Sequence, residues 1–138
     1  MKRLFLDANL LFTAAHNPQG KATLLLELAG AGCWEVVTSA YAVEEARRNL
    51  SRKFPDRLDA FEALLALLLV APSPSGAACP LPLREKDRPI FEAALACGAT
   101  HLLTGDLRDF GPFMNDPRQT RGIVIQSVAE FLRDIGTE

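Results

Sequence analysis

Five acidic residues, in four separate parts of the chain, lie near predicted strand ends or helix starts. Asp7 follows the apolar run RLFL, while Asp106 and Asp109 come after the apolar run HLLT. The other two acids precede or lie within predicted helices, Asp87 and Glu45. Aspartates at such places are often ordinary turn residues or helix caps, because their carboxylates bond to nearby backbone amides. A functional site requires that folding bring these acids together.

The chemistry that such a group of acids could perform depends on a cation. Carboxylates that face one another repel, and they stay ionised near neutral pH only when positive charge lies among them. Mg²⁺ or Mn²⁺ prefers oxygen ligands, keeps several waters and needs few protein carboxylates. Such an ion activates water for attack on phosphorus and stabilises charge on the leaving oxygen. His16 and His101 have no partner histidine at ligand spacing, so neither is expected to bind metal.

The acid in the predicted helix after residue 39 is either Glu44 or Glu45. The buried face of that helix is defined by four apolar residues, Ala42, Val43, Ala46 and Leu50. At about 100° per residue, Glu45 lies on the flank of this face, whereas Glu44 points closer to the opposite side. We therefore favour Glu45, although its neighbour remains an alternative.

The elements that must position these acids alternate between strand and helix. Strands are predicted over residues 3–7, 34–39, 100–104 and 122–126. Helices are predicted over residues 9–16, 21–30, 40–53, 55–68, 87–98 and 127–135, and the end of the fourth, near residues 67–70, could instead be strand. This alternation predicts a three-layer α/β/α sandwich with a mostly parallel central sheet. Ligands of such sheets bind outside the carboxyl ends of the strands, which is where Asp7, Glu45, Asp87 and Asp106 fall.

Composition limits the class of protein. The chain has 138 residues, of which 49% are hydrophobic, and this predicts one domain over residues 1–138. Apolar runs are too short to span a bilayer and an acid interrupts the N-terminal run, so we expect a soluble, cytoplasmic protein without membrane association. The Pro-, Gly- and Ser-rich stretch Ala71–Pro82 predicts a long surface loop. Three scattered cysteines suggest neither a disulfide framework nor a zinc site.

The net charge of −2 argues against a surface that binds nucleic acid everywhere, but it permits a basic rim around an acidic pocket. Basic residues cluster in three places: Arg47, Arg48, Arg52 and Lys53; Arg84, Lys86 and Arg88; and Arg118 and Arg121. Each cluster could be an ordinary solvated face or could contact phosphates.

Four segments, in this order, resemble the PIN-domain family, including the VapC-like toxin ribonucleases of prokaryotic toxin–antitoxin pairs. They are LFLDANLLF, TSAYAVEEARRNL, DRPIFEAALACGATHLLTGDLRDF and IVIQSVAEFL. The resemblance extends over nearly the whole chain. It implies an α/β/α fold, an acidic pocket that binds Mg²⁺ or Mn²⁺, and metal-dependent cleavage of RNA phosphodiesters. It also implies a homodimer and an antitoxin protein as partners.

The family's functional residues match this chain position by position. Asp7 matches the acid that ends the first strand, and Glu45 matches the helix acid. Asp87 matches the acid before the stretch A-x-x-x-G-A-x-x-L-x-T, and Asp106 matches the acid of the T-x-D element, so the implied metal ligands are Asp7, Asp87 and Asp106. Asp109 matches an acid position that varies in the family and is the fifth predicted catalytic residue. Two polar residues match positions that support these acids, Asn9 and Thr104.

The leading hypothesis is a metal-dependent endoribonuclease that serves as the toxin of a toxin–antitoxin pair. In it, the arginines of residues 47–53 and those near Arg118 would contact the RNA phosphates. One alternative is an RNA-processing nuclease that is not a toxin, and another is an inactive PIN-like module that binds RNA or protein. A phosphate-transfer regulator of the receiver-domain type also gathers acids at strand ends. That class needs an adjacent acidic pair after the first strand, but Asp7 is followed by Ala8 and Asn9.

Overall fold

The computed structural model describes residues 1–72 and 79–136. Within these residues, five strands form one parallel sheet in the order β3-β2-β1-β4-β5. The strands are β1 (Arg3–Leu6), β2 (Glu35–Ser39), β3 (Leu69–Ala71), β4 (His101–Leu103) and β5 (Val124–Gln126). The wholly parallel sheet confirms the predicted fold class.

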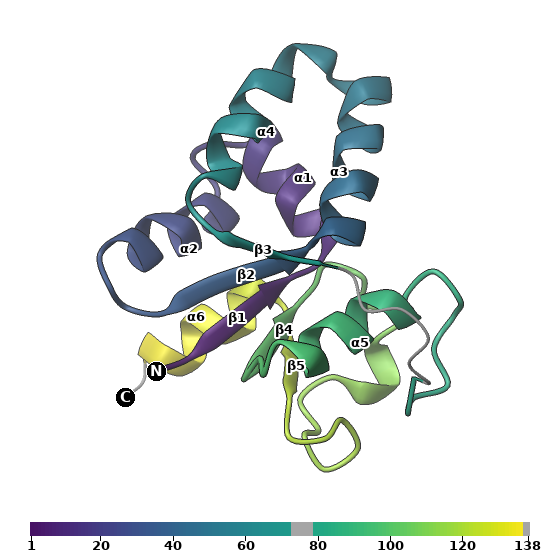
Figure 1. The fold of residues 1–138 in the computed structure, drawn as a ribbon. Helices are drawn as coiled ribbons and strands as arrows, with labels where there is room; N and C mark the ends of the chain where they lie inside the picture. The colour runs from purple at the N-terminus through teal and green to yellow at the C-terminus, as the bar shows by residue number, and fades with distance from the viewer. Residues whose placement is uncertain (73–78, 137–138) are drawn as a thin grey trace.

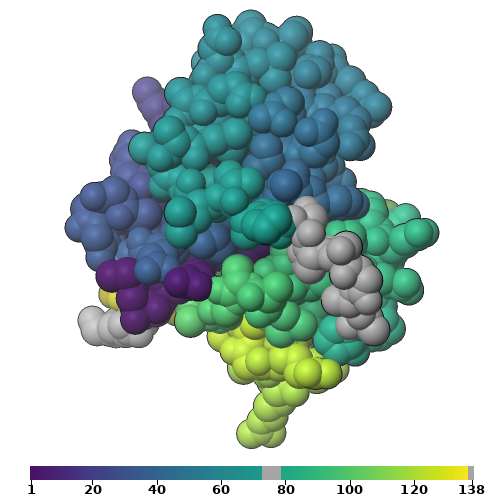
Figure 2. Space-filling model, viewed as in Figure 1, coloured from purple at the N-terminus to yellow at the C-terminus, as the bar shows by residue number. Residues whose placement is uncertain are grey.

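Helices cover both faces of this sheet, as Figure 1 shows. The α-helices of the described chain are α1 (Ala8–His16), α2 (Lys21–Gly30), α3 (Ala40–Lys53), α4 (Leu58–Leu65), α5 (Arg88–Ala96) and α6 (Val128–Gly136). Two short 3₁₀ turns accompany them, η1 (Pro55–Arg57) and η2 (Gly111–Phe113). Helices α1, α3 and α4 gather on one side and α5 lies on the other. In the space-filling view, α3 and α4 form a prominence above α5 (Figure 2).

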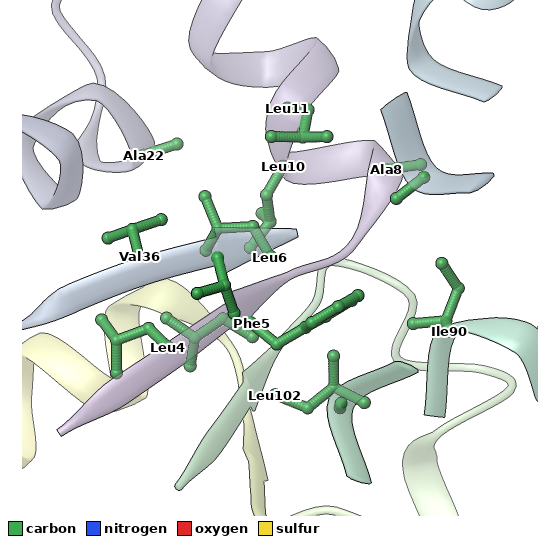
Figure 3. Packing of buried hydrophobic residues seen from close by; sticks show 14 of the residues in the cluster. Leu4, Phe5, Leu6, Ala8, Leu10, Leu11, Ala22, Val36, Ile90 and Leu102 are labelled. Atoms are coloured by element: carbon green, nitrogen blue, oxygen red, sulfur yellow. The ribbon is translucent and has the colours of Figure 1, made fainter. Parts of the chain in front are cut away.

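The central strand β1 divides the core, because successive side chains of a strand point to opposite faces. Leu6 packs towards Leu10 of α1, whereas Phe5 is directed towards Ile90 of α5 (Figure 3). Leu6 and Phe5 are both fully buried. Burial on both faces explains why the first strand is an almost continuous apolar run.

Local sequence signals set several element boundaries. The Ser39 hydroxyl caps α3 by accepting a hydrogen bond from the amide of Ala42 at 3.2 Å. Gly98 ends the helix before β4 with a φ of 70°, a left-handed conformation that favours glycine. Ser127 and Glu130 form a capping box at α6, in which each side chain accepts a hydrogen bond from the other residue's amide.

The predicted helix over residues 55–68 is too long. Pro55 begins the 3₁₀ turn η1, and α4 then ends at Leu65. The chain continues into β3 from Leu69, which agrees with the alternative prediction of a strand near residues 67–70. Of the predicted loop Ala71–Pro82, residues 73–78 lie outside the described residues, and Ala71 belongs to β3. Over the described ranges, no helix combines the length and the apolar character needed to cross a membrane.

Candidate metal centre

The predicted acids lie at the carboxyl ends of the central strands. Asp7 directly follows β1, and its amide donates a hydrogen bond to the carbonyl of Leu103 at the end of β4. Asp106 lies in the turn after β4, and Asp87 is the residue before α5. Parallel pairing of β1 with β4 therefore brings together residues separated by about a hundred positions in sequence, as the Thr104 to Asp7 hydrogen bond shows (|i−j| = 97).

Three aspartates, Asp87, Asp106 and Asp109, form an acidic trio. Each offers a carboxylate oxygen, and these oxygens all lie within 4.8 Å of one another. Asp106 shapes the turn as well, because its Oδ1 accepts a hydrogen bond from the amide of Asp109 at 3.1 Å. Asp87 is only 5% exposed, and its buried Oδ2 has no hydrogen-bond partner among the described residues. A buried carboxylate oxygen without a partner is costly unless a proton or a cation meets it.

Asp7 lies beside this trio without being part of it. Its carboxylate is buried and already bonded: Oδ1 accepts from the amide of Ala8 at 2.7 Å, and Oδ2 accepts from the hydroxyl of Thr104 at 2.8 Å. The charges of Asp106 and Glu45 nevertheless act on it. The structure thus groups Asp109, rather than Asp7, with Asp87 and Asp106.

The Thr104 hydroxyl connects the two acidic groups. It donates to Asp7 and accepts a hydrogen bond from the amide of Asp106 at 3.0 Å. Asn9 supports the same turn, because its Oδ1 accepts from the amide of Gly105 at 2.8 Å and its Nδ2 reaches Asp7 Oδ2 at 3.3 Å. Asn9 and Thr104 therefore occupy the supporting positions predicted for them.

Burial and mutual repulsion disturb the ionisation of these acids. Burial raises the pKa of the Asp7 carboxyl to about 6, against the lowering effect of its hydrogen bonds with Thr104 and Ala8. Burial, and then the neighbouring Asp109, raises the pKa of Asp87 to about 7. Contact with Asp87 holds the pKa of Asp109 below its usual value. The pKa values of two adjacent carboxyls move apart in this way because ionisation of both places two negative charges close together.

The two neighbouring glutamates of α3 have different surroundings. Glu44 is exposed and pairs with Arg47 at 3.3 Å. Glu45 is half-buried, and its negative charge contributes to the raised pKa of Asp7. The geometry therefore places Glu45 on the side of the acidic centre, as its position on the helix predicted.

Two basic side chains adjoin the trio in a way that sequence reasoning missed. Arg84 Nη1 lies 3.5 Å from Asp109 Oδ1, and Lys86 Nζ lies 3.9 Å from its Oδ2. Both side chains are more than half exposed, at 64% and 54%. The sequence placed these residues in a basic cluster just before Asp87, which was a signal that they would border the site. Arg47, which belongs to another basic cluster of the sequence, instead forms an ion pair with Glu62 at 2.8 Å.

The donor set fits a hard divalent cation. All of its ligand atoms are carboxylate oxygens, which Mg²⁺ and Mn²⁺ favour. Asp87, a member of the trio, also has a buried oxygen, Oδ2, without a partner among the described residues. The histidines make ring contacts: His16 stacks on Phe54 with ring centroids 4.0 Å apart, and His101 packs against Phe131.

Comparison with known proteins gives a family match. The sequence profile of a family described as PIN domain matches residues 3–108. No curated protein matches the chain.

Several solved structures share the fold at low identity. DNA-bound VapBC from Salmonella typhimurium is 18% identical, with a TM-score of 0.67, over 93% of this chain and 99% of that chain. VapBC2 from Rickettsia felis, bound to a DNA fragment from its promoter, is 16% identical, with a TM-score of 0.67, over 91% and 98%. VapC20 from Mycobacterium tuberculosis, a sarcin-ricin loop cleaving toxin, is 13% identical, with a TM-score of 0.57, over 79% and 94%. At these identities the likeness concerns the fold.

Proposed function

The chain belongs to the PIN domain family, and from this premise we propose that it is a Mg²⁺- or Mn²⁺-dependent endoribonuclease, the toxin of a toxin–antitoxin pair. The observation that carries the proposal is the acidic trio Asp87, Asp106 and Asp109, of which Asp87 has a buried oxygen without a partner among the described residues. Residues 1–138 would form the nuclease domain.

The proposed work of the protein residues follows from their positions. Asp87, Asp106 and Asp109 would hold the cation, and Asp7, whose charge interacts with that of Asp106, would complete its surroundings. A bound Mg²⁺ or Mn²⁺ would supply activation of water and stabilisation of charge on the leaving oxygen. Glu45, half-buried on the flank of the centre, would orient the attacking water. In the reaction, the attacking water loses a proton and its oxygen bonds to phosphorus, while the bond from phosphorus to the ribose oxygen breaks and that oxygen takes up a proton.

The basic rim would bind the RNA backbone. Arg84 and Lys86 are exposed next to Asp109, and Arg48 is exposed on α3. Cations beside an acidic centre attract phosphates that the acids alone would repel, because contacts to Lys and Arg supply most of the affinity for nucleic acid backbones.

The test is cleavage of a labelled RNA by purified protein with and without Mn²⁺. Asp106→Asn and Asp7→Asn should each lower the rate by about a hundredfold or more, because each removes a charge that the cation or the attacking water depends on. Glu45→Gln should also lower it, whereas Glu27→Gln, which removes an exposed acid on α2, should not. Undiminished cleavage by both aspartate variants would contradict the proposal.

The toxin role has its own test, since an RNA-processing nuclease would share the same chemistry. Several structures with this fold are VapBC complexes, which supports an antitoxin as partner. Induced expression should arrest growth, and coexpression of a small upstream gene encoding a DNA-binding domain and a tail should restore it. Cleavage without growth arrest would favour the RNA-processing nuclease. The expected homodimer is checked by light scattering.

The alternative of an inactive binding module also makes a distinct prediction. Calorimetric titration should detect Mn²⁺ binding by the wild-type chain and none by Asp87→Asn. Absence of wild-type binding at millimolar Mn²⁺ would favour the inactive module.

A further inference from the structure

Two grooves open beside the acidic centre, and Tyr41 lines both. One, of about 630 Å³, is lined by Tyr41, Arg84, Glu85, Lys86 and Pro89. The other, of about 410 Å³, is lined by Ala40, Tyr41, Glu44, Glu45 and Arg48. Tyr41 is the second residue of α3 and therefore stands at the carboxyl end of β2, on the edge of the sheet that bears the acids.

The side chain of Tyr41 is anchored and lies within electrostatic reach of the centre. Its hydroxyl donates a hydrogen bond to the backbone carbonyl of Lys86 at 2.9 Å, which links α3 to the segment before α5. Partial burial, followed by the charges of Glu45 and Asp87, raises the pKa of its phenol. The ring is thus a neutral, half-buried aromatic group placed between acids from two different elements.

Each groove also contains a cation that the other lacks. Arg84 and Lys86 line the first groove beside Glu85, and Arg48 lines the second beside Glu44 and Glu45. A chain that crosses Tyr41 from one groove to the other would meet positive charge before and after the acids. This pattern suits a polyanion with flat apolar groups between its charges, and single-stranded RNA is such a polymer, because its unpaired bases can stack on aromatic side chains.

We propose that Tyr41 is a binding residue for single-stranded RNA, on which one base stacks between the two grooves while Arg48 and Lys86 contact the phosphates on either side. The inference rests on the proposed function and assigns the residue that receives one base of its substrate. Bases in a duplex are already stacked and cannot reach the ring.

The test measures RNA binding separately from cleavage. Fluorescence anisotropy uses a labelled single strand of about 12 nucleotides with the Asp106→Asn protein in Mn²⁺, so that the strand stays intact. Adding Tyr41→Ala should weaken binding by about tenfold, the usual value of a lost base stack. Tyr41→Phe retains the ring and should bind within about threefold of the parent. A duplex of the same sequence should bind more weakly and be insensitive to Tyr41→Ala.

The proposed phosphate contacts of Lys86 and Arg48 are tested by the salt dependence of binding, with Lys21 as the control. Lys86→Gln and Arg48→Gln should each reduce the dependence of log affinity on log salt by about 0.7, the value for one phosphate contact of a single strand. Lys21→Gln, an exposed lysine on α2 outside both grooves, should leave it unchanged. Equal effects of all three would contradict specific contacts in the grooves.

The outcomes separate this inference from the proposed function. If the wild-type protein cleaves RNA while Tyr41→Ala binds as its parent does, the inference is wrong and the nuclease proposal stands. If the wild-type protein neither binds nor cleaves RNA, both are wrong. Circular dichroism checks whether the Tyr41→Ala protein is folded. If it is not, the Asp106→Asn protein is titrated instead with a set of RNA strands, each of which has an abasic site at a different position. Binding should be weaker for one of these strands, and equal binding of all of them would overturn the inference.

Discussion

Asp7 is an acid whose burial destabilises the fold and which we propose for the site. It is 3% exposed, and its two oxygens accept hydrogen bonds from Ala8, Thr104 and Asn9. Burial still outweighs these hydrogen bonds, so the folded state raises the pKa of this carboxyl to about 6. An acid kept in such a place destabilises the metal-free protein whenever it is ionised.

This cost predicts a pH dependence of stability in the absence of metal. The Asp7 pKa is raised in the folded state, so its stabilising contribution is complete below about pH 4 and is lost as the pH rises through about 6. The loss amounts to about 3 kcal/mol of unfolding free energy by pH 7. Asp7→Asn should therefore be more stable than wild type at pH 7, with a smaller decline between pH 4 and pH 7. Urea denaturation in EDTA measures both.

The control for Asp7→Asn is Asp56→Asn, which removes an exposed carboxylate on η1 and should leave the wild-type decline unchanged. Some decline should persist in Asp7→Asn, because burial also raises the pKa of Asp87, to about 7. An Asp7→Asn protein with the full wild-type decline would show that the dependence arises elsewhere.

At the scale of elements, α6 depends on a short sequence signal. The Ser127 hydroxyl accepts from the amide of Glu130 at 3.1 Å, and the Glu130 carboxylate accepts from the amide of Ser127 at 2.9 Å. The bond from Ser127 lowers the pKa of Glu130. The helix then packs Phe131 edge-on against Trp34, with ring centroids 5.1 Å apart.

Ser127→Ala should lower the unfolding free energy by about 1 kcal/mol, because the first turn of α6 loses its cap. Urea denaturation measures the change. Ser51→Ala, which alters an exposed serine within α3, is the matched control and should have little effect. Mn²⁺-dependent cleavage should be unaffected, since α6 contributes no acid to the trio. Equal stability of the two serine variants would show that the cap adds nothing.

The helices and strands were the most predictable part of this structure. The strands followed from apolar runs, and helix ends followed from single residues such as Ser39 and Gly98, all of which are local signals. The predicted helix over residues 55–68 was wrong at its end because its leucines suit a helix or a strand equally well. Pairing of β3 with β2 decides between them, and that pairing is a tertiary contact.

At the scale of the whole molecule, metal binding should be coupled to stability. A cation that binds only the folded acids stabilises the fold by about 2.7 kcal/mol at a concentration of 100 times Kd. Mn²⁺ should therefore raise the melting temperature of the wild-type protein. The rise should grow from pH 6 to pH 8, because Asp87, whose pKa is about 7, must lose its proton to bind a cation.

Differential scanning fluorimetry with and without Mn²⁺ measures this coupling. Asp87→Asn should remove the rise, whereas Glu44→Gln, an exposed acid of α3 paired with Arg47, should retain it. A rise of equal size in Asp87→Asn would place the bound cation outside the acidic trio.

Sequence alone predicted the acids of the candidate centre, the parallel α/β architecture and the edge of the sheet where those acids would meet. These follow from residue type and local periodicity, which do not need distances. Only tertiary packing decided that Asp109 joins Asp87 and Asp106, that Thr104 ties up Asp7, and that Tyr41 stands between two grooves. Distances across a sheet and the burial of a carboxylate depend on residues far apart in the chain, so no local pattern contains them.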